Sequence, residues 1–436
     1  MDKHTLTDLN IPNLLLEICP DEKVVNAVVA DLQTLQQNQT VIIQRQREMA
    51  DFINNPELLS IMQRQVRQLD ELKEQHRSER LAVAKSRAQS AHSAAKDQLG
   101  PIISNISLIV KQAEECIKLY NDLPVYLQDF AFTSDFLTVF KASLVKIIDN
   151  KTQMRFKAFV KDIQSLQSAS SQHQSRISIT YTIDSSLNKL SYCISQLSFD
   201  LAPASVRKRI SFQKSDSILN LLRRKKNKRK EEEFEIAEAF FSYSIVGGLA
   251  YLMDILTQFI QNLQRPFEYI QKHLHLYKFG IALAVHYKTQ SIPYCFPEIV
   301  APGQQTPNTH PLTMRYGGDG LDHFDVLQEY ALLQLFAQAG FPIASEQTQV
   351  AIVSGLFAQF SSNELVLGRF EEEVREMSAI CRKIKPHGMI LFHEVFQSTA
   401  YEDIAEPFAQ IIDHLIKLPC RVILVTHNSF LAERLK

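Results

Sequence analysis

The chain has 436 residues, of which 45% are hydrophobic and 22% are charged, and its formal net charge is −1. This length is enough for two to four domains with ordinary buried cores. The near-neutral balance excludes polyanion binding driven by bulk charge, so any such role needs a local basic patch. The six cysteines are scattered, without a Cys-x-x-Cys pair, which argues against a disulfide framework or a zinc site and fits reduced thiols.

Neither a signal segment nor a membrane span is predicted. No apolar run follows Met1, and the most apolar candidate, residues 236–256, is interrupted by Glu238 and Asp254, so a core helix is expected there. With only 12 glycines and no tryptophan, the composition favours helix over turn-rich β structure. We therefore expect a mostly helical cytoplasmic protein.

The N-terminal part is predicted to be helical. A long amphipathic pattern over 24–53 is broken at Pro56, since the residue before a proline disfavours helix. Residues 73–98 are almost wholly polar or Ala and fit a solvated helix or a linker equally well. A clear amphipathic helix over 102–119 is followed by two further helical stretches within 126–166.

The residues between 176 and 233 differ from this pattern. Apolar and polar residues alternate over 176–184, which is typical of a half-buried strand, and a helix is predicted again over 187–197. The block 223–230 carries seven Lys and Arg in eight residues, directly before three Glu. Such a block is usually a solvated connector, with contact to phosphates or an anionic surface as the alternative.

The C-terminal part is predicted to be α/β. Residues 234–287 hold long apolar helices with one break at Pro266, and 291–320 contain five Pro and four Gly and are predicted to form a long loop. Beyond it, helical and strand patterns alternate: a helix to 340, a strand near 350–360, a helix over 370–384, a strand over 389–393, a helix to 417 and a strand over 421–425. This alternation predicts a mostly parallel sheet with covering helices. In the helix over 370–384, the charges that include Glu371, Glu372 and Glu373 are predicted to form a solvated face.

Two of these strands end on polar residues. The strand over 389–393 delivers His393 and Glu394, and the strand over 421–425 is followed by His427. A buried strand with an acid at its C-terminal tip is typical of nucleotide-binding α/β sheets. Without the family context, Glu394 is more often a solvated or capping carboxylate, and His427 is more often a hydrogen-bonded loop residue.

A glycine-rich segment precedes the helix that ends at 340. Gly317, Gly318 and Gly320 supply the backbone freedom of a phosphate-binding loop, but its Lys and its hydroxyl residue are absent. Acids at 319, 322 and 325 stand where phosphate charge would lie, so repulsion is expected despite the helix N-terminus. His323 and His393 have no further ligands at suitable spacing, so no metal site is predicted from them.

The order of these motifs resembles the MutS family of DNA mismatch-repair-type ATPases, most closely the short bacterial MutS-like proteins without the mismatch-recognition domain. The likeness is strongest over 354–435 and extends weakly back to residue 5. Leu367-Gly368-Arg369 resembles the family's signature loop, 389–399 its Walker B segment, and Val425-Thr426-His427 its Thr-His switch.

The resemblance implies a role for each matching position. Glu394 falls at the general-base position and His427 at the position that senses the γ-phosphate. In the degenerate phosphate-binding loop formed by Gly317, Gly318 and Gly320, His323 replaces the Lys and Phe324 replaces the Mg²⁺-binding hydroxyl. His393 replaces the Walker B Asp, while Gly368 and Arg369 belong to the signature loop. ATP and Mg²⁺ are the implied cofactors, and loss of the loop Lys alone is expected to cost on the order of 10³ in rate.

The predicted fold class is α plus α/β, a mostly helical core and lever arm joined to a P-loop-type ATPase domain with a mostly parallel sheet. The predicted domains are a helical core over 1–75, a clamp-like arm over 76–200, a basic linker over 201–233, a second core part over 234–290, and a C-terminally short ATPase domain over 291–436.

The function implied by the resemblance is DNA binding of the mismatch-repair or recombination type, with weak or lost ATP hydrolysis. Its implied partners are double-stranded DNA and a second copy or a paralogue in a dimer. The alternative is a pseudo-ATPase scaffold that binds a protein and neither DNA nor ATP.

Overall fold

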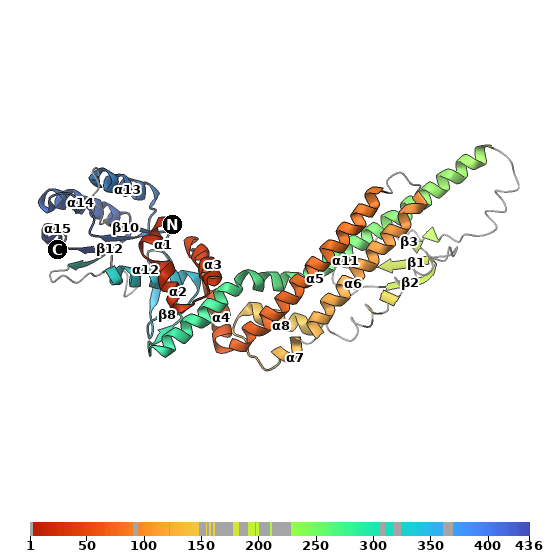
Figure 1. Cartoon of the computed structure of the whole chain (residues 1–436), viewed down its shortest axis with the longest axis horizontal. Coiled ribbons are helices and arrows are strands. Elements are labelled where there is room, and N and C mark those ends of the chain that lie inside the picture. Colours follow the sequence, from red (N-terminus) through yellow and green to blue (C-terminus); the bar gives the residue numbers. More distant parts are fainter. Residues whose placement is uncertain are drawn as a thin grey trace. The chain divides into compact units, whose positions relative to one another are not determined.

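The computed structural model divides into two compact units. The first contains Met1–Leu59, Phe132–Leu137 and His273–Lys436, and the second contains Ser60–Ala131 and Thr138–Lys272. Helices α5 (Pro56–Gln89) and α11 (Lys228–Thr289) have residues in both (Figure 1). The structure describes residues 3–89, 95–121, 123–147, 154, 157, 160–161, 178–182, 191–196, 198–199, 210–211, 228–304, 310–316, 324–360 and 369–436.

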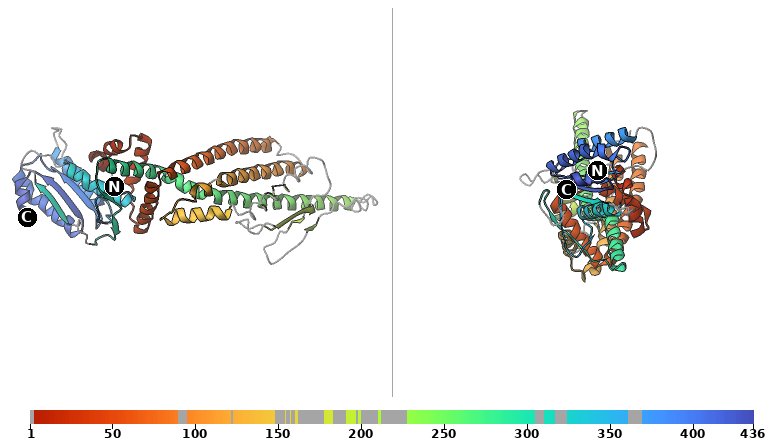
Figure 2. Two further views of the ribbon diagram at one scale, coloured as in Figure 1. Left: turned by 90° about the horizontal axis from the view of Figure 1, so that it is seen from below. Right: turned by 90° about the vertical axis from the view of Figure 1, so that its left-hand side faces the viewer.

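The second unit is built mainly from long helices (Figure 2). Besides its parts of α5 and α11, it contains α6 (Ala95–Asn121), α7 (Leu123–Leu127) and most of α8 (Asp135–Ile147). Gln271 of α11 donates a hydrogen bond to Asp70 of α5 (2.7 Å). Phe140 of α8 packs edge-on against Phe267 of α11, with ring centroids 5.4 Å apart. Both α5 and α8 therefore pack on α11.

Short strands accompany these helices and correct one prediction. The strand expected over 176–184 is β1 (Ser178–Thr182), which pairs antiparallel with β2 (Ser191–Gln196). The helix predicted over 187–197 was therefore wrong for 191–196, because pairing such as Tyr181 with Tyr192 overrides local helix preference. A second antiparallel pair is formed by β3 (Ser198–Phe199) and β4 (Ile210–Ser211).

The predicted break at Pro266 was also wrong. Helix α11 continues through this proline, although a proline removes one helical hydrogen bond and crowds the preceding turn. Its neighbours Leu263 and Phe267 are each only 2% exposed. Burial of the two side chains on either side of Pro266 holds the helix together across the lost hydrogen bond.

The first unit begins with four short helices, α1 (Lys3–Asp8), α2 (Ile11–Ile18), α3 (Glu22–Gln33) and α4 (Gln39–Asn54). The single pattern predicted over 24–53 is thus two helices. Asn38 starts α4 by accepting hydrogen bonds from the backbone N–H groups of Thr40 and Val41, which is the usual role of an asparagine N-cap. The break predicted at Pro56 is confirmed, because α4 ends at Asn54 and α5 begins at Pro56.

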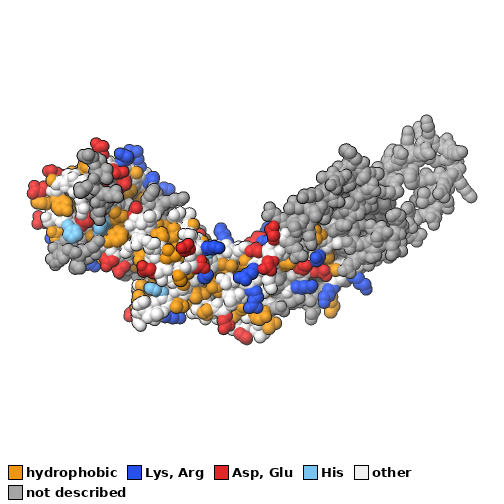
Figure 3. Space-filling view, viewed as in Figure 1, with side chains coloured by type: hydrophobic (Ala, Val, Ile, Leu, Met, Phe, Trp, Pro, Cys, Tyr) orange, Lys and Arg blue, Asp and Glu red, His pale blue; other side chains and the backbone are white. Residues whose placement is uncertain are grey.

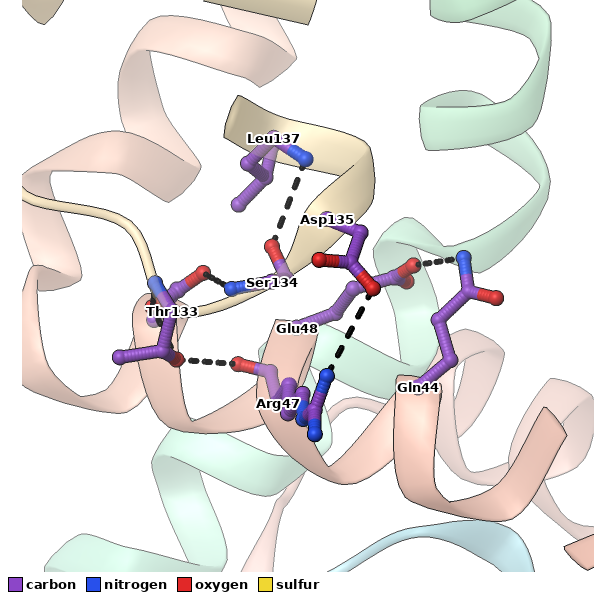
Figure 4. Close-up of polar contacts among 8 residues, drawn as sticks. Gln44, Arg47, Glu48, Thr133, Ser134, Asp135 and Leu137 are labelled. Atoms are coloured by element: carbon purple, nitrogen blue, oxygen red, sulfur yellow. Dashed lines mark hydrogen bonds and ion pairs between the residues drawn. The ribbon is translucent and has the colours of Figure 1, made fainter. Parts of the chain in front are cut away.

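A buried carboxylate holds the loop before α8 against α4. Asp51 is 2% exposed, and it accepts hydrogen bonds from the Thr133 N–H (2.8 Å), the Thr133 hydroxyl (2.8 Å) and the Ser134 N–H (2.9 Å). Arg47 of the same helix lies 3.5 Å from Asp135, a contact that Figure 4 marks with a dashed line. The three buried hydrogen bonds, rather than this exposed ion pair, fix the loop.

A four-stranded parallel sheet forms the centre of the C-terminal part. Its order is β10 (Leu356–Phe360), β11 (Met389–His393), β12 (Arg421–Thr426) and β7 (Leu312–Tyr316). The helices of this part are α12 (Phe324–Ala339), α13 (Arg369–Lys383), α14 (Tyr401–Lys417) and α15 (Ser429–Arg434). The central strands β11 and β12 are almost fully buried, which explains their unbroken apolar runs. The helical part and the parallel sheet of the predicted fold class are confirmed.

The long loop predicted over 291–320 was wrong in part. It contains β5 (Tyr294–Cys295), which pairs antiparallel with β8 (Ile343–Ala344), and β6 (Glu298–Val300), which pairs parallel with β9 (Gln349–Ala351). It also contains β7, an edge strand that follows Pro311. Prolines are tolerated before an edge strand, so the proline content did not exclude strands here.

The single strand predicted near 350–360 is two strands, β9 and β10. In the described part of the chain, no helix combines the length and the apolar character that crossing a membrane requires.

Candidate functional site

The carboxyl edge of the parallel sheet brings two predicted site residues together. Strands β11 and β12 pair in parallel with His393 opposite Val425, so the residues that follow both strands emerge at the same edge. The backbone N–H of Glu394 extends this pairing by donating to the Val425 carbonyl (3.0 Å). Glu394 and His427, 33 residues apart in sequence, are thereby placed in contact.

The two side chains form a carboxylate–imidazole pair. Glu394 Oε1 lies 2.5 Å from His427 Nδ1, and Gln397 Nε2 donates to Glu394 Oε2 (3.1 Å). A carboxylate oxygen accepts hydrogen bonds, so in this contact Nδ1 of His427 is the donor. The His427 side chain is 38% exposed and that of Glu394 only 7%. The imidazole is therefore the more accessible of the two groups, and the buried carboxylate orients it.

A strained turn positions this carboxylate. Glu394 has φ 50° and Phe396 has φ 65°, both in the left-handed region that non-glycine residues rarely adopt. Phe396 is 2% exposed, and its ring centroid lies 5.3 Å from that of Phe408 on α14. Left-handed residues cost about 1–3 kcal/mol each, which burial of the Phe396 ring offsets.

Hydrogen bonds around Asn428 fix the backbone beside His427. The Asn428 N–H donates to the Thr426 hydroxyl (3.1 Å), and its side-chain oxygen accepts from the Leu431 N–H at the start of α15 (3.0 Å). Its side-chain amide donates to the carbonyl of Tyr401 (3.1 Å). Burial, and secondarily the charge of Glu394, raise the pKa of Tyr401. The loop that carries His427 is thus tied both to α15 and to the start of α14.

Next to the pair lies a set of rings that we call the aromatic group: Phe324, Phe360 and His393. The ring centroids of Phe324 and Phe360 are 5.3 Å apart, and His393 lies 5.3 Å from Phe324 and 6.1 Å from Phe360. The rings meet at interplanar angles of 71°, 75° and 61°, the edge-to-face packing that aromatic rings favour. Phe324 and His393, the positions where the resemblance implies Mg²⁺-binding residues, therefore contact each other.

These residues do not fit Mg²⁺. The ion prefers oxygen ligands in octahedral geometry, whereas the aromatic group offers two hydrocarbon rings and one imidazole. Among the described residues, no group of three or more His, Cys, Asp or Glu side chains is arranged to hold a metal ion.

The loop after β11 is also tied to α13. Glu373 is 5% exposed; its carboxylate accepts from the Ser398 hydroxyl (3.0 Å), and its carbonyl accepts from Gln359 Nε2 (2.8 Å). The prediction of a solvated face was therefore wrong for Glu373. Its spacing distinguishes it from its exposed neighbours Glu371 and Glu372, because Glu373 lies four residues before the buried Met377 and therefore on the same helix face.

The remaining predicted site residues are described only in part. Gly317, Gly318, Gly320, His323 and Gly368 lie outside the described residues. Arg369 is the first residue of α13, and its side chain also lies outside them. The glycine segment joins the end of β7 to the start of α12, the strand-to-helix position expected of a phosphate-binding loop. In the basic block, residues 223–227 lie outside the described part, and 228–230 begin α11.

Comparison with known proteins gives one weak similarity. The chain is 28% identical over 105 residues to a protein of Lactobacillus acidophilus named endonuclease MutS2, a match that covers 23% of this chain and 13% of that protein. No family model matches the chain. The similarity points to a MutS-related protein, and the chain spans only a small part of the relative's length.

Proposed function

We propose that the chain is a MutS-like protein that binds double-stranded DNA in a mismatch-repair or recombination setting. The observation that supports the MutS-like assignment is the Glu394–His427 pair at the carboxyl edge of a parallel sheet, where the resemblance implies the residues of an ATPase site. The similarity to a MutS2 endonuclease supports the same assignment.

We further propose that ATP binding and hydrolysis are weak or lost. The aromatic group stands where the resemblance implies Mg²⁺ ligands. Without oxygen ligands for the metal, the charge that develops on the transferred phosphoryl group is not neutralised. Glu394 and His427 are then a proton-transfer pair without the metal site that nucleotide hydrolysis uses.

Titration of the full chain with labelled ATP and Mg²⁺ tests this second proposal. We expect neither micromolar affinity nor turnover. Either result would contradict the loss of nucleotide chemistry. If turnover occurs, comparison of His427→Gln with Gln410→Ala, an exposed change on α14, shows whether the Glu394–His427 pair is responsible for it.

DNA binding is tested by gel shift on duplex and branched DNA at several salt concentrations. A protein that contacts phosphates loses affinity linearly in log–log form as salt rises, and we expect this slope. Deletion of 223–230 tests the basic block separately: an unchanged salt slope assigns the DNA contacts to other residues. Sedimentation at several protein concentrations tests the proposed homodimer, and mixing with a MutS paralogue tests the heterodimer.

A scaffold that binds a protein partner is the second candidate. Figure 3 favours it in one respect: on the face shown, Lys and Arg side chains of described residues are interspersed with Asp and Glu rather than gathered in one patch. Mixed charges give weak attraction to a polyanion. Absence of DNA binding at low salt would support the scaffold and refute the DNA-binding proposal.

A further inference from the structure

A cavity of about 380 Å³ lies at the opposite, amino edge of the parallel sheet. Its lining includes Arg421, the first residue of β12, together with Gly388 before β11 and Pro311 before β7. His427 follows the carboxyl end of β12. At roughly 3.3 Å per strand residue, it lies about 20 Å from Arg421 at the start of that strand. The cavity is therefore separate from the Glu394–His427 pair.

The charges that line this cavity are positive or neutral. Arg421, His310 and His387 are among its lining residues, and none of the lining residues is an aspartate or glutamate. Burial lowers the pKa of Arg421, yet a guanidinium stays charged in proteins. An arginine that is partly withdrawn from water often has a carboxylate partner, and among the described residues Arg421 forms no ion pair with an aspartate or glutamate.

Packing holds the guanidinium in place and leaves donors available. The Arg421 Cζ lies 5.1 Å from the ring centroid of Tyr330 on α12, the face-on contact that arginine makes with aromatic rings. Such stacking uses the face of the guanidinium and leaves its in-plane N–H groups free. The Arg421 Nε–H is buried and has no hydrogen-bond partner in the described part of the chain. Because this atom is closed to water, the donors that Arg421 can offer to a molecule in the cavity are its terminal Nη groups.

Another part of the cavity lining contains a close contact between Gly303 and the side chain of His387. Gly303 has φ 78°, and a Cβ at this position would lie 2.5 Å from Cε1 of the His387 ring. His387 itself has φ 63°, a conformation with a cost for a non-glycine residue. Only glycine at 303 leaves room for this imidazole. Arg421 and His387 therefore both contribute nitrogen atoms to the lining of the same cavity.

We propose that this cavity binds a small molecule through an oxyanion group, either a phosphate or a carboxylate, with Arg421 as the principal donor. The planar guanidinium matches both groups through paired N–H donors. His387 and His310 supply further ring nitrogens. The volume is at the low end of small-molecule sites, so the ligand is a metabolite-sized anion rather than a nucleic acid strand.

The test is calorimetric titration of the full chain with inorganic phosphate and, separately, with succinate. Saturable binding of phosphate alone assigns a phosphorylated ligand, and saturable binding of succinate alone assigns a carboxylate. Saturation by neither overturns the proposal. Arg421→Gln is expected to weaken binding at least tenfold, because loss of a charge-assisted hydrogen bond has about that effect.

Arg434→Gln is the matched control. It removes the same charge from an exposed arginine that pairs with Glu406 (2.7 Å), and binding should be unchanged. Equal loss in both variants would show a general charge effect and refute the site. If Arg421→Gln does not fold, the ¹⁵Nε signal of Arg421 in the unmodified chain replaces it: a shift that saturates with the anion supports the site, and an unchanged signal refutes it.

Discussion

Replacing Asp51 by Ala removes the carboxylate that holds the loop before α8. Asp51 is 2% exposed and accepts three hydrogen bonds at 2.8, 2.8 and 2.9 Å. Two of the donors are backbone N–H groups of Thr133 and Ser134, and Ser134 is fully buried. After truncation these donors have no acceptor, and water reaches them only if the loop moves away from α4.

A hydrogen bond to a charged group contributes about 1.5–3 kcal/mol, and three bonds to one carboxylate are not additive. We therefore expect Asp51→Ala to destabilise the first unit by about 3–5 kcal/mol. Asp51→Asn keeps one acceptor oxygen but directs an amide at one donor, so about half of that loss is expected. Arg47→Ala removes only the ion pair with Asp135, whose side chains are 52% and 86% exposed, and such pairs contribute about 0–1 kcal/mol.

Native-state hydrogen exchange is the appropriate measurement, because a chain with two units need not unfold in one step. The amides of Thr133 and Ser134 should lose protection in Asp51→Ala, and urea unfolding gives the stability of the first unit. Arg47→Ala is the control on the same helix. A loss below about 1 kcal/mol, or equal losses in the two variants, would refute the assignment of the stability to the buried hydrogen bonds.

Three further predictions concern single residues. Gly340→Ala should destabilise by about 1–3 kcal/mol in urea unfolding, since Gly340 has φ 88° and an added Cβ would lie 2.6 Å from Cβ of Arg45; an unchanged midpoint would contradict this. Burial raises the pKa of Asp31, but the hydrogen bond and charge of His275, together with the charges of Arg45 and His273, lower it by more, so the net shift is downward. Its carboxylate therefore stabilises the fold above the unfolded pKa of about 3.9 and loses this effect as pH falls through the lower folded value, so Asp31→Asn should flatten the acid limb of stability against pH, and an unchanged limb would refute the contribution. Burial raises the pKa of Cys116 to about 11, so this thiol should react with iodoacetamide far more slowly in the folded chain than in urea at pH 8, and equal rates would contradict its burial.

Local sequence patterns were sufficient to predict the helices and strands whose own residues have a clear apolar pattern or a proline break. The apolar runs of β11 and β12 were predicted at 389–393 and 421–425, and the structure has Met389–His393 and Arg421–Thr426. The break at Pro56 was found because a proline restricts the residue before it. The expectation of a parallel sheet followed from the alternation of strands and helices.

Elements whose formation depends on distant partners were missed. The residues of β2 have a helical pattern, and their pairing with β1 makes them a strand. β7 was not predicted because it lies in a proline-rich segment and its partner β12 is more than 100 residues away in the sequence. The prediction of a helix break at Pro266 was wrong for the same reason, because packing around the proline decides whether the helix continues.

The candidate site shows the same division. The apolar runs were sufficient to predict Glu394 and His427 at the ends of two strands. The replacement of Mg²⁺-binding residues by Phe324 and His393 was expected from the resemblance alone. Only the tertiary structure showed that the two side chains touch and that Phe324, Phe360 and His393 pack together. It also showed that Glu373 is buried and that Nε of Arg421 is closed to water. Periodicity reports which face of an element is apolar, whereas contacts between side chains depend on strand order and register, which no local pattern encodes.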